Sequence, residues 1–236
     1  MTDRRSVLYD NKRKKMGGND LARTVKRPEE RRLEIIQAAA NLFSVKGYEK
    51  TAVNDIIQDI GVAKGTFYHY FNSKEEIADA VIQMVIQESI PVLREIERKE
   101  GVAAVEKLLQ VTEAFSAKAT QAYRDGLMNH LHQEGHSVFH QKMKVQMIKD
   151  YVPILTSIVE QGVREGQFHT LYPQQITEFL LVGLHFMLDP SLFACSKEQF
   201  NEKVKAVSEI YEKMLGTAPG SFSLVSVYLE ELYPAQ

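Results

Sequence analysis

The residues best suited to chemistry in this sequence are short polar side chains that follow Gly61. They combine an ammonium, a hydroxyl, a phenol and an imidazole around a glycine that lets a partner approach closely: Lys64, Gly65, Thr66, Tyr68 and His69. An ammonium donates to guanine O6 and N7 or to a phosphate, and hydroxyl groups bind phosphate oxygens. No nucleophile is paired with a base here, so the set predicts DNA binding rather than covalent catalysis.

Two short helices around a glycine turn must position these side chains. Apolar residues recur at i, i+3, i+4 and i+7, which is one face of a helix: Val53, Ile56, Ile57 and Ile60. Thr51 is expected to cap that helix, and Gly61 allows the left-handed backbone that ends it. A second helix beginning near Ala63 is expected to bury Phe67 and Phe71 and to show the polar set outward. In a helix-turn-helix this second helix enters the DNA major groove.

The segment GVAKGTFYHYFNSKEEI, residues 61–77, resembles the recognition helix of the TetR family of one-component transcriptional regulators. The resemblance extends over residues 30–80 and includes the segment GYEKTAVNDII. Three positions depart from the family pattern: Ala52 replaces Thr or Ser, Ile57 replaces Ala, and Ala63 replaces Ser. Losing a serine at position 63 removes an N-cap, about 1 kcal/mol of local helix stability. These departures bear on which operator sequence is bound, and they do not weaken the resemblance to the family.

The resemblance implies a set of DNA contacts in the motif and at the starts of the neighbouring helices: Thr51, Asn54, Lys64, Gly65, Thr66, Tyr68, His69 and Lys74. Thr51 and Lys74 stand at expected helix N-termini, where free N–H groups meet phosphates. Asn54 occupies a position that sometimes reads a base in the family. The alternative for each is an ordinary exposed side chain, and Tyr70 is expected to pack onto the head.

Composition sets the class of protein. The 236 residues are 44% hydrophobic and 25% charged, which is enough apolar material for a sizeable core. No apolar run approaches the ~20 residues that cross a bilayer, and no apolar signal sequence is present. The single cysteine, Cys195, excludes an intrachain disulfide. The sequence therefore predicts a cytoplasmic protein that makes no membrane contact.

Charge is divided unevenly along the chain. Residues 1–74 hold 15 Lys+Arg and 9 Asp+Glu, whereas the remainder holds 14 and 22. A basic front and an acidic rear suit a DNA-binding head on a body that avoids DNA, although charge also varies by chance. We expect a flexible basic N-terminal extension over residues 1–27, a helix-turn-helix domain over 28–73, and a helical effector-binding and dimerisation domain over 74–236.

Apolar periodicity predicts an all-α fold, with a three-helix N-terminal domain and a helical C-terminal domain. The first helix is expected from Pro28 to Lys46, and a linking helix from the capping-box pattern Ser73-x-x-Glu76 to Lys99, bent at Pro91. Body helices are expected over residues 102–119, 120–131, 137–165, 173–188, 197–215 and 221–232.

Two apolar stripes late in the chain occupy the place where TetR-like regulators dimerise through a four-helix bundle. They are Ile176, Phe179, Leu180, Gly183, Leu184 and Met187, then Phe200, Val204, Val207, Ile210 and Tyr211. The resemblance implies a homodimer that addresses a pseudo-palindromic operator. The alternative is that both stripes belong to the core of one chain.

Aromatic and methionine residues gather in the body and suit an adaptable apolar pocket for an unidentified small-molecule effector: Phe115, Tyr123, Met128, Phe139, Met143, Met147, Tyr151 and Phe186. The alternative is plain core. The sequence thus predicts a repressor that binds operator DNA and that an effector releases.

Two other functions compete with this hypothesis. One is a helical metalloenzyme using four histidines in HLHQEGHSVFH: His130, His132, His136 and His140. The other is an architectural DNA-binding protein without an effector. The histidine spacing lacks the H-E-x-x-H pattern and a cysteine ligand, so neither a metal nor another cofactor is expected.

Overall fold

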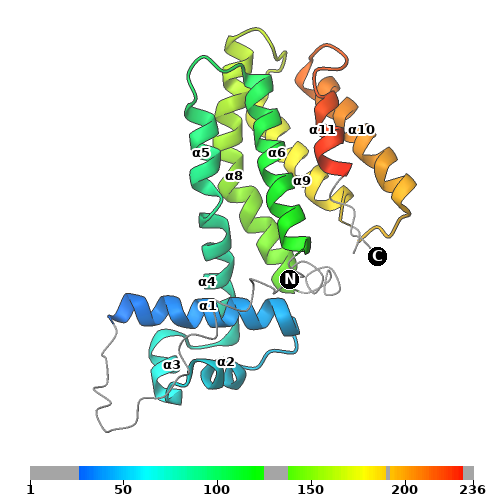
Figure 1. Ribbon diagram of the computed structural model, residues 1–236. Coiled ribbons are helices and arrows are strands. Elements are labelled where there is room, and N and C mark those ends of the chain that lie inside the picture. The colour runs from blue at the N-terminus through cyan, green and yellow to red at the C-terminus, as the bar shows by residue number, and fades with distance from the viewer. Residues whose placement is uncertain (1–26, 125–137, 190–191, 231–236) are drawn as a thin grey trace, which may run out of the picture.

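The computed structural model describes residues 27–124, 138–189 and 192–230, with the backbone alone for 118–124. Within these ranges all regular structure is helical (Figure 1). The helices are α1 (Pro28–Lys46), α2 (Val53–Ile60), α3 (Lys64–Tyr70), α4 (Lys74–Gln87), α5 (Ile90–Arg98), α6 (Ala104–Arg124), α8 (Val138–Arg164), α9 (Pro173–Met187), α10 (Lys197–Leu215) and α11 (Ser223–Glu230). The predicted all-α fold is confirmed. Residues 1–26, most of the predicted extension, lie outside the description.

Helices α1, α2 and α3 form a small head at one end of the molecule (Figure 1). Its core is built from fully buried side chains, including Ile35 on α1, Ile56 on α2 and Phe67 on α3. Gly61 ends α2 with a φ of 64°, in the left-handed region where a side chain is strained. The predicted glycine turn between the two short helices is therefore confirmed.

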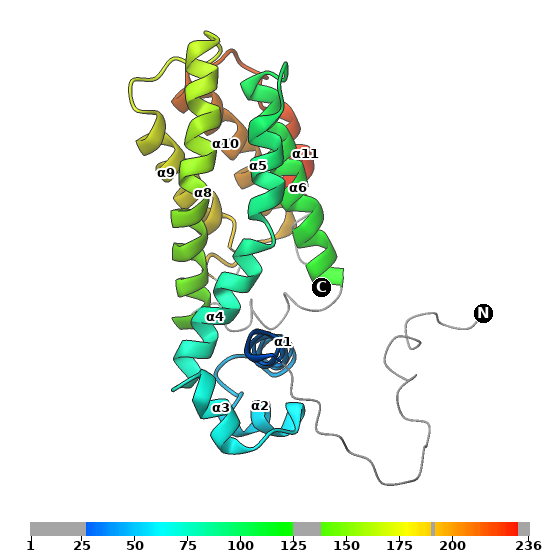
Figure 2. The ribbon, with the colours of Figure 1, turned by 90° about the vertical axis from the view of Figure 1, so that its left-hand side faces the viewer.

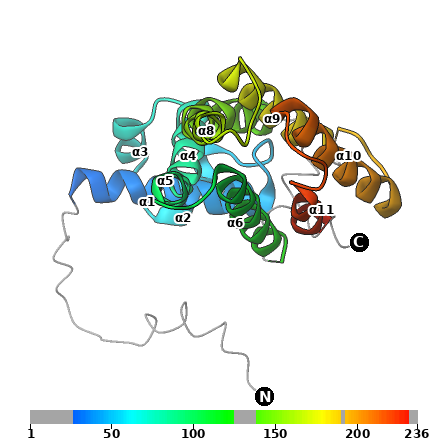
Figure 3. The same ribbon diagram turned by 90° about the horizontal axis from the view of Figure 1, so that it is seen from above.

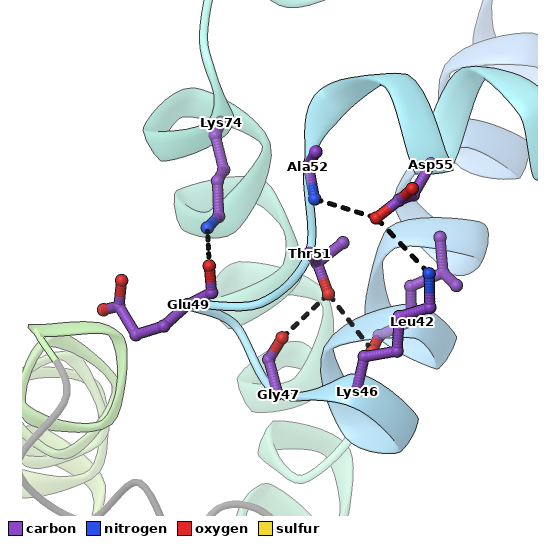
Figure 4. A network of polar contacts seen from close by, with 8 residues as sticks. All are labelled: Leu42, Lys46, Gly47, Glu49, Thr51, Ala52, Asp55 and Lys74. Atoms are coloured by element: carbon purple, nitrogen blue, oxygen red, sulfur yellow. Dashed lines mark hydrogen bonds and ion pairs between the residues drawn. The ribbon is translucent and has the colours of Figure 1, made fainter.

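Thr51 does not cap α2 as predicted. The helix begins one residue later, with Ala52 at the N-cap, and the Thr51 side chain is only 1% exposed. Its hydroxyl donates to the carbonyl oxygen of Gly47 at 2.7 Å and so closes the turn after α1 (Figure 4). The Asp55 carboxylate accepts the Ala52 N–H at 3.0 Å instead. Because the Thr51 hydroxyl is enclosed, the prediction that it meets a DNA phosphate is wrong.

The linking segment is two helices rather than one bent helix. Ser73 caps α4, and its hydroxyl oxygen accepts the Glu76 N–H at 3.1 Å. The Glu76 carboxylate accepts the N–H of Asn72 at 2.7 Å, one residue before the position that a capping box requires. Helix α4 ends at Gln87 and α5 begins at Ile90, with Pro91 in its first turn. Proline has no N–H to donate and fits there without loss.

The body is a bundle in which α8, 27 residues long, reaches from the head along its whole length (Figure 2). Helices α5, α6 and α9 pack against α8, while α10 and α11 cover the far side of the bundle (Figure 3). Helix α6 is continuous through the break predicted after residue 119, since its sequence contains neither glycine nor proline. No helix in the described part of the chain is long and apolar enough to cross a membrane.

Candidate DNA interface and effector cavity

The outer face of α3 carries the polar set that the sequence singled out. Lys64, Gly65, Tyr68 and His69 are exposed, and Thr66 is half-buried. A side chain added at Gly65 would meet no atom within 4 Å, so the backbone there is open to a partner. On the inner face, Phe67 is completely buried and fixes the rotation of the helix. The face is therefore held in place by the head's core, and α3 itself lies on the side of the head away from the body (Figure 1).

Two further predicted contacts flank α3. Asn54 is exposed on α2. The Lys74 ammonium donates to the carbonyl oxygen of Glu49 at 3.2 Å (Figure 4) and lies 4.1 Å from the centre of the Tyr48 ring. Lys74 therefore ties the start of α4 to the turn between α1 and α2, so its charge is engaged within the head.

Phe139 was predicted in the effector pocket, but it packs against the head instead. Its ring stacks on Tyr48, with centroids 5.2 Å apart, and lies 5.5 Å from the ring of Phe43. The side chain is 4% exposed. The reason is that α8 begins at Val138, which places Phe139 in the turn nearest the head. Nearby, Lys142 of α8 forms an ion pair with Asp79 of α4 at 3.0 Å.

We expect Phe139→Ala to lower the free energy of unfolding by about 3 kcal/mol, because truncating this buried ring leaves a cavity beside Phe43 and Tyr48. Urea unfolding followed by far-UV circular dichroism measures the change. Leu171→Ala is the matched control, since Leu171 is 89% exposed and should change stability by less than about 0.5 kcal/mol. Equal effects of the two substitutions would contradict the packing of Phe139.

A cavity of about 270 Å³ lies inside the body. Four of the predicted residues line it: Phe115, Met143, Met147 and Tyr151. Phe186 is not part of the lining, and its ring centre lies 4.7 Å from the Lys144 ammonium. The Tyr123 side chain and Met128 lie outside the described residues. The remaining lining comes from Leu108, Val111, Thr112, Ser116, His140, Lys144, Leu155, Leu181, Leu184, His185, Leu188, Asp189, Tyr211 and Leu229.

A buried polar cluster forms part of the cavity wall. The Asp189 carboxylate accepts from the Lys144 ammonium and makes a contact of 3.1 Å with Nε2 of His140. All three side chains are at least nine-tenths buried. Sequence reasoning missed Lys144 and Asp189. The available signal was spacing, since Lys144 follows His140 by four residues and precedes Met147 by three, on the stripe that faces the cavity.

His185 also lines this wall. Burial lowers its pKa to about 4. The nearby Lys144 ammonium lowers this pKa further, whereas the Asp189 carboxylate raises it. The unfolded chain takes up this proton near pH 6.5, whereas the folded chain takes it up only near pH 4. The unfolded state therefore binds more protons between these values, so stability falls as the pH is lowered from 6.5 to 4.

His185→Leu should reduce that acid destabilisation by about 2 kcal/mol at pH 4.5. Urea unfolding of wild type and variant at pH 7 and pH 4.5 measures the difference. An identical loss of stability in both proteins on acidification would show that His185 titrates normally in the fold.

The histidine cluster is only partly described. His130, His132 and His136 lie outside the described residues, and His140 pairs with Asp189. Among the residues described, no group of three or more His, Cys, Asp or Glu side chains has the arrangement to hold a metal.

The two predicted dimer stripes divide between core and surface. Leu180, Phe200, Val204 and Val207 are at most 7% exposed and pack inside their own chain, so their assignment to a dimer interface is wrong. The cause is that α10 uses this stripe to cover α9 and α11. Phe179 and Ile210 are 63% and 37% exposed. The others are half-buried, and two of them line the cavity: Ile176, Gly183, Leu184, Met187 and Tyr211.

Comparison with known proteins identifies both parts of the chain. Residues 35–81 match the family model described as bacterial regulatory proteins, tetR family, and residues 118–210 match that of the tetracyclin repressor-like C-terminal domain. The fatty acid metabolism regulator protein of Bacillus subtilis (strain 168) is 30% identical over 137 residues, covering 57% of this chain and 69% of that protein.

A second relative is similar in sequence, and one solved structure is similar in fold. The HTH-type transcriptional repressor KstR2 of Rhodococcus jostii (strain RHA1) is 27% identical over 145 residues, 59% of this chain and 69% of the relative. The solved structure of RolR in complex with resorcinol is 15% identical, covers 84% of this chain and 93% of its own, and has a TM-score of 0.61, which shows a shared fold. With the exposed α3 face and the helical body, these matches establish that the chain belongs to the TetR family of transcriptional regulators.

Proposed function

We propose that this ligand-responsive DNA-binding repressor binds a pseudo-palindromic operator as a homodimer and leaves it when a small molecule enters the body cavity. The observation that carries the proposal is the exposed polar face of α3, held in place by the fully buried Phe67. The repressor name of the Rhodococcus relative supports the direction of regulation. Neither a metalloenzyme nor an effector-independent architectural protein has comparable support.

On the DNA side, we assign base and phosphate contacts to residues 28–73, the helix-turn-helix domain. The contacts are Asn54, Lys64, Gly65, Thr66, Tyr68 and His69. Lys64 stands at the first position of α3, where an ammonium reaches guanine or a phosphate. Lys74 acts indirectly, because its ammonium holds the turn between α1 and α2 in place. We assign effector binding and dimerisation to residues 74–236.

For the dimer, we assign the interface to the outward faces of α9 and α10. Phe179 and Val182 of α9 and Ile210 of α10 are exposed apolar side chains on these helices. A side chain built at Gly183 would meet no atom within 4 Å, so a partner helix has room to approach. Exposed aromatic and aliphatic residues on adjacent helices favour a self-complementary contact about a two-fold axis.

For release, the structure offers a short route from the cavity to the head. Phe139 and His140 are neighbours in the first turns of α8. The Phe139 ring packs on Tyr48 of the head, while the His140 ring contacts Asp189 in the cavity wall. A ligand that favours one arrangement of this wall over another therefore shifts α8 against the head. That shift changes the separation of the two α3 helices in the dimer.

Selection of fragments from a genomic library tests the DNA-binding part of the proposal. We expect the purified protein to enrich an inverted repeat and to bind it about 10³-fold more tightly than random DNA at physiological salt. Fluorescence anisotropy at two salt concentrations measures both affinities. Equal affinity for all sequences, with a steep salt dependence, would favour the architectural alternative.

A further inference from the structure

The cavity joins apolar walls to a buried pair of opposite charges. Lys144 and Asp189 form an ion pair in which both side chains are at least nine-tenths buried, and both residues line the cavity. We propose that the effector is an uncharged, compact apolar molecule that carries a hydroxyl group, a phenol by preference, and that this hydroxyl donates to the Asp189 carboxylate and accepts from the Lys144 ammonium. This inference rests on the proposed function, since it names the class of molecule that the regulator detects.

Charge balance is the first reason. The formal charges of Lys144 and Asp189 cancel within the pair, so a neutral ligand adds no net charge beside them. A ligand carboxylate attracted to Lys144 would also lie beside the Asp189 carboxylate, and a ligand ammonium would lie beside that of Lys144. Either ligand buries a net charge with no counterion, which is far more costly than burying a hydrogen-bonded hydroxyl.

Hydrogen-bond chemistry is the second reason. A hydroxyl both donates and accepts, whereas a carboxylate only accepts and an ammonium only donates. One hydroxyl can therefore donate to Asp189 and accept from Lys144 without breaking their pairing. The low pKa of His185, about 4, keeps that imidazole uncharged at neutral pH, so His185 adds no charge for an ionic ligand to use.

The apolar walls define the rest of the ligand. The rings of Phe115 and Tyr151 stack with centroids 5.2 Å apart and planes 27° apart, and both residues line the cavity, so they give it an aromatic wall that suits an aromatic ligand. Met143 and Met147 are flexible and adapt to its outline. The volume, about 270 Å³, lies just below the roughly 300–1,000 Å³ of typical small-molecule sites, which favours a compact ligand.

Three probes with the same apolar body test the class of ligand: 4-propylphenol, 4-propylbenzoate and 4-propylbenzylammonium. Calorimetric titration of the full-length protein without DNA, at pH 8 so that imidazoles are neutral, gives the three affinities. We expect the phenol to bind at least tenfold more tightly than either ion. Equal or tighter binding of an ion, or no binding of the phenol, would overturn the proposal.

Variants of the charged pair sharpen this test. Asp189→Asn leaves a net positive site and should shift the preference to the benzoate, and Lys144→Met leaves a net negative site and should shift it to the ammonium. Because each leaves a buried charge unbalanced and can unfold the body, the neutral double variant K144M/D189N is included. In this double variant, the ratio of the affinity for 4-propylphenol to the affinity for propylbenzene should be at least tenfold lower than in the wild type. Unchanged phenol preference in the double variant would overturn the proposal.

Lys142→Met is the matched control, because Lys142 lies on the same helix but is 44% exposed and pairs with Asp79 outside the cavity. Its probe affinities should equal those of the wild type. Operator binding is measured on the same preparations. A wild-type protein that binds no operator would contradict the proposed function. The ligand preference is decided separately, by the titrations without DNA.

Discussion

Replacing Lys64 and His69 together by alanine should weaken operator binding at least a hundredfold and leave the fold intact. Both side chains are exposed on α3, so their removal disturbs no core packing. Each lost base or phosphate contact costs about 1–3 kcal/mol, and a homodimer loses every contact twice. Fluorescence anisotropy with the selected operator measures the affinity, and thermal unfolding confirms that the variant is folded.

Lys99→Ala is the control for the loss of positive charge. Lys99 is exposed and directly follows α5, a helix whose C-terminal end lies far from the head (Figure 1). Its replacement should change operator affinity less than twofold. If the α3 double variant binds the operator as tightly as the wild type, α3 is not the reading helix.

Phe179→Glu should convert the dimer to a monomer and reduce operator affinity at least a hundredfold. Phe179 is 63% exposed on α9, and a two-fold contact brings each introduced carboxylate close to its symmetry mate and to buried apolar surface. A monomer holds one half-site and loses the advantage of linked binding to two. Analytical ultracentrifugation at micromolar concentration measures the oligomeric state.

The matched control for this substitution is Val92→Glu. Val92 is an apolar residue on α5 with 44% of its surface exposed, away from the proposed interface. The control should sediment as wild type. A Phe179→Glu protein that remains dimeric would move the interface away from this face of α9.

Local sequence pattern was sufficient to predict the helix-turn-helix. The i, i+4 apolar spacing, the glycine at position 61 and the aromatic anchors Phe67 and Phe71 each act within a few residues, so the chain's own sequence determines the two short helices. The N-cap of α4 was predicted correctly for the same reason, because the Ser73 hydroxyl accepts from the Glu76 N–H only three residues away. The resemblance to the TetR family then supplied the function.

Contacts between distant segments were harder to predict. Phe139 and Phe115 look alike in sequence, yet one packs on the head and the other lines the cavity, because the start of α8 decides which way each turn faces. Val204 and Ile210 belong to one apolar stripe, but the packing of α10 on its neighbours buries the first and exposes the second. The pair of Lys144 and Asp189 spans 45 residues, and no local period connects them.

Photo-crosslinking from α3 tests most directly whether this helix meets DNA. A benzophenone amino acid replaces Tyr68, which is 44% exposed, and in a control protein it replaces Val227 of α11, which is 56% exposed. Irradiation with the operator should crosslink the protein labelled at position 68 to both half-sites, at positions related by the two-fold axis, and should leave the control uncrosslinked. Crosslinking at position 227 with none at position 68 would contradict the assignment of α3 as the DNA-reading helix.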